Sequence, residues 1–463
     1  MIKEHMFGIV SMGGLRLSKI RGDDVAHIVI PKPFYLDDKV ALMEEDASFE
    51  IAGDRDAEAC ALNASHTVKA KKQPPKVPKS FLASSCIFNC AYCNCRCTRE
   101  DRENYCFSPR ELANLSVSRA YQEGHGVFVT SAIYKNADYT QELLAETVRI
   151  MRQELHYRGY IHAKVMPGVD PQLIKRTGRY ADRLSVNIEV AKSEGYARIA
   201  KQKNKKNILE PMKTISDMIQ LSKYEKGAFA RSQSTQLMAG SVGEDDRAIV
   251  NLAHALYNKY KLKRVYYTAF QYKQQARGYG ELPPVSTPYW RMARLYQADR
   301  LMELYGFLPS EITPESRPNL VYDLDPKSCW ALEHLDRYPV EVNKADFHTL
   351  IRIPGIGVTY AQKIIEARKY CTVTHDVLRK MRVALKRSVY FITCNGIYMG
   401  GSTLDGLNLR SHLVTDPEGL SISGSLLESP AVKYPALASP ESGNFILESP
   451  YPVQLSMDQC LYH

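Results

Sequence analysis

Between residues 80 and 307 the sequence alternates short apolar runs with longer amphipathic segments. Short apolar runs are typical of buried strands, and amphipathic stretches of ten or more residues are typical of helices. We expect strands at 80–84, 126–132, 161–166, 184–190, 235–239 and 265–270. We expect helices after them at 109–122, 141–157, 171–180, 208–224, 245–260 and 289–305. Alternating strands and helices imply a parallel sheet covered by helices, so the predicted fold class is α/β.

A cysteine-rich loop follows the first expected strand. Cys86, Cys90 and Cys93 have the spacing C-x3-C-x2-C, and Tyr92 precedes the third cysteine. Thiolates at this density bind a soft metal or an iron–sulfur cluster. Three thiolates can bind three irons of a cubane and leave the fourth iron open for chemistry, as an open position does at catalytic zinc. Zinc is the main alternative, although no second C-x2-C follows at the spacing of a zinc ribbon.

The cysteine spacing and the position of Tyr92 resemble the radical S-adenosylmethionine (radical SAM) superfamily. The resemblance implies a [4Fe–4S] cluster on Cys86, Cys90 and Cys93, and S-adenosylmethionine bound to the open iron. It implies cleavage of that cofactor to a 5′-deoxyadenosyl radical, with electrons from a donor such as flavodoxin or ferredoxin. The six units resemble the partial (β/α)6 barrel of these enzymes, whose chemistry lies at the carboxyl ends of the strands. Tyr92 is a candidate contact to the cofactor.

Polar residues and a glycine-containing turn end three further strands, where the same site would lie. Ser131 ends the second strand where the superfamily usually has a Gly-Gly-Glu turn for the amino group of S-adenosylmethionine, so the sequence departs from the family there. Ser185, Asn187 and Glu189 share one face of the fourth strand by its period of two. A ribose or a carboxylate would satisfy their polar groups. Val242 lies in a turn that resembles the one packing the adenine.

A second motif lies beyond the expected barrel, at 350–365. Two amphipathic segments flank an Ile-Pro-Gly-Ile-Gly turn that contains Gly355 and Gly357. Glycines permit a tight turn and close backbone approach, and N–H groups at a helix start can bind a phosphate. The stretch resembles the helix-hairpin-helix motif, which binds the DNA backbone without regard to sequence, and Lys363 would add charge. The alternative is a hairpin that serves only for packing.

The barrel, the hairpin and the segment 386–394 together resemble radical SAM proteins described as DNA modification or repair proteins, distant relatives of spore photoproduct lyase. The resemblance covers residues 80–396. It implies an enzyme that repairs or modifies a base of DNA held by the hairpin. The alternatives are RNA modification by the same chemistry and a DNA-binding iron–sulfur redox sensor without turnover.

The formal net charge of +10 is unevenly distributed over the 463 residues. Lys and Arg concentrate at 344–387, and acidic residues prevail from 396 onward. A basic module fits a polyanion partner such as DNA. We therefore expect a leader and linker at 1–79, a radical SAM core at 80–310, a small all-α helix-hairpin-helix module at 311–396, and a disordered tail at 397–463.

The expected tail contains one short motif, at 454–457. This stretch resembles the peptide with which bacterial proteins dock on the sliding clamp, which makes the clamp a candidate partner. Asp458 stands where that peptide has an aromatic residue, which favours chance similarity.

No apolar run approaches the length of a membrane-spanning helix, and no signal peptide is expected. The odd number of cysteines, eleven, fits a reducing cytoplasm.

Overall fold

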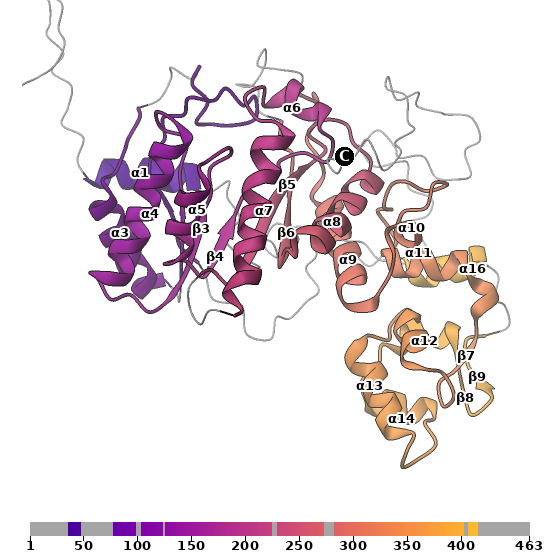
Figure 1. The fold of residues 1–463 in the computed structure, drawn as a ribbon. Coiled ribbons are helices and arrows are strands. Elements are labelled where there is room, and N and C mark those ends of the chain that lie inside the picture. The colour runs from indigo at the N-terminus through magenta and orange to yellow at the C-terminus, as the bar shows by residue number, and fades with distance from the viewer. Residues whose placement is uncertain are drawn as a thin grey trace, which may run out of the picture.

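The computed structural model describes residues 36–47, 77–98, 103–123, 126–224, 229–272, 282–401 and 406–414. Its largest part is a sheet of six strands in sequence order, each parallel to the next (Figure 1). The strands are β1 (Lys79–Phe81), β2 (Gly126–Thr130), β3 (Tyr160–Lys164), β4 (Arg183–Ser185), β5 (Ser232–Ala239) and β6 (Arg264–Ala269). Each overlaps a segment expected to be a strand, and the predicted partial (β/α)6 barrel is confirmed.

Helices cover the sheet and connect its strands (Figure 1). One main helix follows each strand in turn: α3 (Pro109–Glu123), α4 (Ala137–Gln153), α5 (Pro171–Gly178), α7 (Lys205–Ser222), α8 (Asp246–Tyr260) and α9 (Tyr289–Tyr305). Two more helices are α1 (Leu36–Ala47), which packs beside β1, and α6 (Glu194–Ile199), between β4 and α7. All five residues of β2 are buried, as expected for a parallel strand covered on both faces.

Side-chain caps determine where several of these helices begin. Asn204 and Asn207 form a reciprocal capping box in which each backbone N–H donates to the other side chain at 2.9 Å. This box explains why α7 begins at Lys205, three residues before the start expected from apolar periodicity. Asp245 caps α8 by accepting the N–H of Ala248 at 2.8 Å.

The helix α9 connects the barrel with the residues that follow it. Two residues before its first turn, Thr287 donates its N–H to the carbonyl of Phe270 at 2.7 Å and its hydroxyl to the carbonyl of Ala239 at 3.0 Å. These bonds place the start of α9 at the carboxyl ends of β5 and β6. The other end of α9 contacts the C-terminal module described next.

The C-terminal module consists of short elements around the predicted hairpin (Figure 1). Its helices are α10 (Pro309–Ile312), α11 (Pro326–Glu333), η2 (Leu335–Arg337), α12 (Phe347–Arg352), α13 (Val358–Ala367), α14 (His375–Lys380), α15 (Leu385–Ser388), η3 (Val389–Phe391) and α16 (Gly406–Leu413). Its strands are β7 (Val340–Glu341), β8 (Ile392–Cys394) and β9 (Ile397–Tyr398). The hairpin itself is formed by α12 and α13.

The small sheet corrects the expectation of an all-α module. β7 pairs in parallel with β8, and β8 pairs in antiparallel with β9. Asn395 and Gly396 join β8 to β9 with φ angles of 53° and 79°, the positive values that a two-residue Asn-Gly hairpin turn requires. The Glu341 carboxylate accepts the N–H groups of both residues, at 3.0 and 2.8 Å. These bonds attach the turn to β7.

The helix α16 is formed by residues expected to belong to the disordered tail. Arg410 donates to both carboxylate oxygens of Asp323 at 2.8 Å, which attaches α16 to the segment before α11. Residues 397–401, which include β9, are also described, whereas residues 402–405 and 415–463, including the clamp-like peptide, lie outside the described residues, as do residues 1–35. Among the helices of the described segments, none has both the length and the apolar character that crossing a membrane requires.

Candidate active site

The cysteine loop lies at the carboxyl end of the sheet and is attached to two neighbouring connections. The N–H of Ile87 donates to the carbonyl of Ile133, after β2, at 2.9 Å. The N–H of Ala91 donates to the carbonyl of Ile199, the last residue of α6, at 2.8 Å. Backbone bonds therefore hold the loop across the strand ends, where parallel barrels carry their chemistry.

The three predicted ligands, Cys86, Cys90 and Cys93, are free thiols on this loop. The N–H of Phe88 donates to Cys86 Sγ at 3.3 Å, and the N–H of Cys95 donates to Cys93 Sγ at 3.4 Å. Backbone N–H groups directed at cysteine sulfur are among the features that tune iron–sulfur clusters. Two of the three sulfurs thus accept hydrogen bonds of the kind that tune a bound cluster.

The protonation of these thiols reflects their burial and their closeness to one another. Burial, together with the nearby charge of Cys93, raises the pKa of Cys86 to about 11. Burial raises the pKa of Cys90 to about 12, against the opposing effect of the Lys203 ammonium. The pKa of Cys93 is lowered, chiefly by a hydrogen bond from the Cys95 thiol. A metal centre would replace the protons of these thiols on binding.

The donor set fits a cubane cluster. Within the described segments, no three Cys, His, Asp or Glu side chains converge as the ligands of a single metal ion do. A cubane does not require such convergence, because each thiolate binds a different iron. It requires three thiols near one another on one loop, and Cys86, Cys90 and Cys93 are close enough that the charge of one raises the pKa of another.

A buried ion pair lies beside the cysteines. Lys203 Nζ is 2.7 Å from Glu189 Oε1, and their side chains are 12% and 9% exposed. Lys203 also donates to the Tyr92 hydroxyl at 3.2 Å. Burial acts to raise the pKa of Glu189, but the Lys203 ammonium outweighs it, so this pKa lies below its usual range. Two predicted residues, Tyr92 and Glu189, are therefore brought together by Lys203, which was not among the predicted site residues.

The backbone of Glu189 is in the left-handed region, with φ at 64°. Its N–H donates to the carbonyl of Gln236 at 3.0 Å, and its carbonyl accepts the N–H of Met238 at 2.8 Å. Bonds to β5 thus hold a conformation that costs a non-glycine residue about 1–3 kcal/mol. Such conformations gather at functional sites, and this one directs the carboxylate toward Lys203.

Ser185 and Asn187 are paired with polar residues of β3. His162 Nε2 is 2.8 Å from Ser185 Oγ, and Lys164 Nζ donates to Asn187 Oδ1 at 2.6 Å. His162 and Lys164 are only 1% and 7% exposed. Sequence reasoning missed them, although their alternation within an otherwise apolar strand was a signal for an inward-facing polar row.

The two remaining predicted contacts are bonded locally or to another helix. Ser131 Oγ donates to the carbonyl of Ala132 at 2.6 Å. Val242 donates its N–H to the Glu244 carboxylate at 3.2 Å, and its carbonyl accepts from Arg198 at 2.8 Å. The turn after β5 is therefore held by the buried carboxylate of Glu244, and the Val242 side chain is 7% exposed.

The hairpin turn packs against the protein itself. Gly355 has a φ of 84°, and a Cβ there would lie 2.7 Å from the carbonyl oxygen of Ala384. A Cβ on Gly357, which begins α13, would lie 3.1 Å from the Tyr305 hydroxyl. Both glycines thus permit close packing within the chain, in addition to any approach of a ligand.

Lys363 is exposed and lies in the second half of α13, away from the N–H groups at its start. Its Nζ is 5.7 Å from the centre of the Tyr360 ring. A different lysine supports the turn: the buried Lys327 donates to the carbonyl of Ile356 at 2.6 Å. The role of Gly355, Gly357 and Lys363 in binding DNA stays a prediction.

No protein-family model and no curated protein matches this chain. Among solved structures it is similar to the FeFe-hydrogenase maturase HydG from Carboxydothermus hydrogenoformans, at 14% identity over 54% of this chain and 55% of that one, with a TM-score of 0.37. It is similar to Streptococcus suis SuiB bound to S-adenosylmethionine, at 11% identity over 58% and 59%, with a TM-score of 0.36.

A third similar structure is the radical S-adenosylmethionine methyltransferase TsrM from Kitasatospora setae with cobalamin and a [4Fe–4S] cluster bound. Identity is 11% over 49% of this chain and 40% of that one, with a TM-score of 0.31. The chain spans less than two thirds of the length of each of these three proteins. At such low similarity, what the chain does must follow from its own residues.

Proposed function

We propose that this protein is a radical SAM enzyme that holds a [4Fe–4S] cluster on Cys86, Cys90 and Cys93 and acts on DNA. The observation that carries the proposal is one loop with three free thiols at the carboxyl ends of six parallel strands. With S-adenosylmethionine at the open iron, the cluster would supply an organic radical. The protein's part is to bind, orient and exclude competing reactions.

The residues beside the cysteine loop have the chemistry to bind S-adenosylmethionine. Glu189 is a carboxylate acceptor for ribose hydroxyls, and Lys203 and Lys164 are cations for a carboxylate. In the present arrangement these groups bond to one another or to Asn187. They are therefore held in place before the cofactor arrives, which lowers the entropy lost on binding.

The C-terminal module supports DNA as the substrate. Its basic segment at 344–387 includes α12 and α13, and α13 begins at the glycine turn. We propose that N–H groups at the start of α13 approach a backbone phosphate and that the exposed Lys363 contacts the same strand. Such contacts would hold a duplex irrespective of its sequence.

The chemistry is tested by anaerobic reconstitution of the Cys90→Ala variant. The parent chain should bind about four iron and four sulfide, and should release 5′-deoxyadenosine with dithionite and S-adenosylmethionine. The variant should lose both, whereas Cys371→Ala, a control at an exposed cysteine of the module, should keep both. One zinc per parent chain without sulfide would refute the proposal. A cluster without cofactor cleavage would favour the redox sensor.

The DNA assignment is tested by the Lys363→Glu variant in fluorescence anisotropy with duplex DNA at several salt concentrations. Reversing a charge near a phosphate should weaken binding about ten-fold or more and flatten the salt dependence. Lys213→Glu is the control, because Lys213 is 71% exposed on α7 in the barrel. If the two variants bind duplex DNA with equal affinity, the hairpin serves only for packing. Tighter binding of duplex RNA than of DNA would favour the RNA-modifying alternative.

A further inference from the structure

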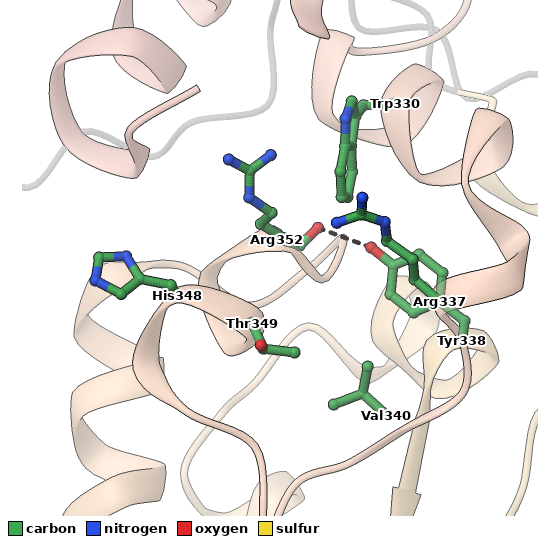
Figure 2. Close-up of a pocket in the computed structure, with 7 residues that line it drawn as sticks. All are labelled: Trp330, Arg337, Tyr338, Val340, His348, Thr349 and Arg352. Carbon is green, nitrogen blue, oxygen red and sulfur yellow. Dashed lines mark hydrogen bonds between the residues drawn. The ribbon is translucent and has the colours of Figure 1, made fainter. Parts of the chain in front are cut away.

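A cavity of about 450 Å³ lies in the C-terminal module, between α12 and the segment that joins α11 to β7 (Figure 2). The side chains that line it are Trp330, Arg337, Tyr338, Val340, His348, Thr349 and Arg352. Its volume is within the range of pockets that hold small molecules or single nucleotides. The function proposed above makes no use of it.

Two guanidinium groups lie beside one indole ring at this cavity. The Arg337 guanidinium lies 5.5 Å and that of Arg352 lies 4.8 Å from the centre of the Trp330 ring. Trp330 is only 2% exposed, so its position is fixed by packing. Arginine cations resting on an aromatic face are oriented before any ligand arrives.

The two arginines differ in whether an acid already neutralises them. Arg352 donates to Glu311 at 2.5 and 3.3 Å. Arg337 is exposed and forms no ion pair with any residue in the described segments. The cavity therefore has one guanidinium whose charge is available to a ligand and a second whose charge is shared with an acid.

The lining supplies hydrogen-bond donors and no carboxylate. Thr349 and His348 are exposed on α12. The nearby Asp346 is engaged as the cap of α12, where it accepts the N–H of Thr349 at 2.7 Å. A lining rich in donors and free of acids favours an anionic ligand.

We propose that this cavity binds a phosphate group of a nucleic-acid strand, with Arg337 as its main contact and Thr349 and His348 at its rim. The guanidinium fork matches the oxygens of a phosphate. Because α12 is the first helix of the hairpin, this contact would hold the strand on a second face of the module. The inference rests on the proposed DNA function and adds to it a phosphate site outside the hairpin turn.

The test compares Arg337→Gln with Arg300→Gln in the full-length protein. Arg300 is the matched control, because its side chain is 54% exposed on α9 and does not line the cavity. Anisotropy with a labelled duplex at several salt concentrations should show about ten-fold weaker binding by Arg337→Gln and a salt slope reduced by about one. Arg300→Gln should match the parent. Thr349→Val, which keeps the guanidinium, should weaken binding less.

Titration with thymidine monophosphate distinguishes a strand from a free nucleotide as the source of the phosphate. Loss of mononucleotide binding in Arg337→Gln, with duplex binding unchanged, would overturn the strand contact and make the cavity a nucleotide site. The parent and both arginine variants could instead bind duplex equally well and with the same steep salt dependence. That result would overturn the phosphate site in the cavity but would leave the proposed DNA function standing. A parent chain that binds no duplex would overturn the DNA function itself.

Discussion

Lys203 in the barrel and Lys327 in the module are both buried, yet their surroundings have opposite effects. Burial acts to lower the pKa of Lys203, but the Glu189 carboxylate outweighs it and raises the pKa above its usual range. Lys327 donates to the backbone carbonyl of Ile356, and burial lowers its pKa to about 7. The barrel lysine belongs to a charged cluster beside thiols, whereas the module lysine supports a turn.

The same contrast holds for the motifs beside these lysines. The cysteine loop presents its thiols next to side chains from other strand ends, so its spacing predicts chemistry directly. The hairpin presents Gly355 to the backbone of Ala384 and Gly357 to Tyr305, so its glycines have a use within the chain. A motif therefore indicates function most reliably when its atoms do not already serve packing.

The largest effect should come from breaking the barrel ion pair. Lys203→Met leaves the Glu189 carboxylate buried without its cation, which costs about 3–5 kcal/mol. Chemical denaturation should show this loss, and adding Glu189→Gln should restore most of it. Lys213→Met is the control, because the Lys213–Asp217 pair is exposed and contributes less than about 1 kcal/mol. Equal losses in the two single variants would contradict a special role for burial.

A smaller loss is expected at the hairpin turn. Gly355→Ala places a Cβ against the Ala384 carbonyl at a positive φ, so strain and overlap together should cost about 2–4 kcal/mol. Gly396→Ala separates the two causes, because Gly396 also has a positive φ but no atom within 4 Å of the new Cβ. In thermal unfolding, the Gly355→Ala variant should have a lower unfolding temperature than the Gly396→Ala variant. The reverse order would mean that the turn is not packed as described.

The smallest effect on stability is expected at Glu341, a carboxylate of the module that is held by backbone N–H groups and not by a cation. Burial acts to raise the pKa of the Glu341 carboxyl. Hydrogen bonds from N–H groups, of which that of Gly396 has the largest effect, outweigh burial and lower this pKa to about 2. The stability that this carboxylate contributes is present above its unfolded pKa, near 4.5, and is lost as the pH falls toward 2.

Glu341→Gln should remove this part of the acid sensitivity, at a cost of about 1 kcal/mol near neutral pH, since solvent screens a partly exposed carboxylate. Urea denaturation of the parent and the variant at pH 6 and pH 3 measures it. Parallel loss of stability in both proteins on acidification would assign the acid sensitivity to other groups. Asp376→Asn, at an exposed carboxylate of the module, is the control.

The sequence predicted the features that depend on local pattern. Strands and helices of the barrel were recognisable because each carries its own apolar periodicity, and the cysteine loop by its spacing. The polar run 201–207 was recognisable as basic, but the pairing of its Lys203 with Glu189 was not predicted because that contact exists only after the barrel closes. The strands β7 to β9 are too short for periodicity, although Asn395-Gly396 was a turn signal that could have revealed two of them.

The helix α9 begins at the ends of β5 and β6 and finishes with Tyr305 against Gly357 of the hairpin. Its 17 residues, at about 1.5 Å each, span about 25 Å. That length equals about seven base pairs of duplex at 3.4 Å each. For the proposed substrate, the length of α9 sets a minimum length of DNA. DNA held at the hairpin reaches the strand ends only if it extends at least about seven base pairs beyond the contact. If the protein holds DNA as proposed above, the length of α9 would set its footprint on that DNA without a contact between the two.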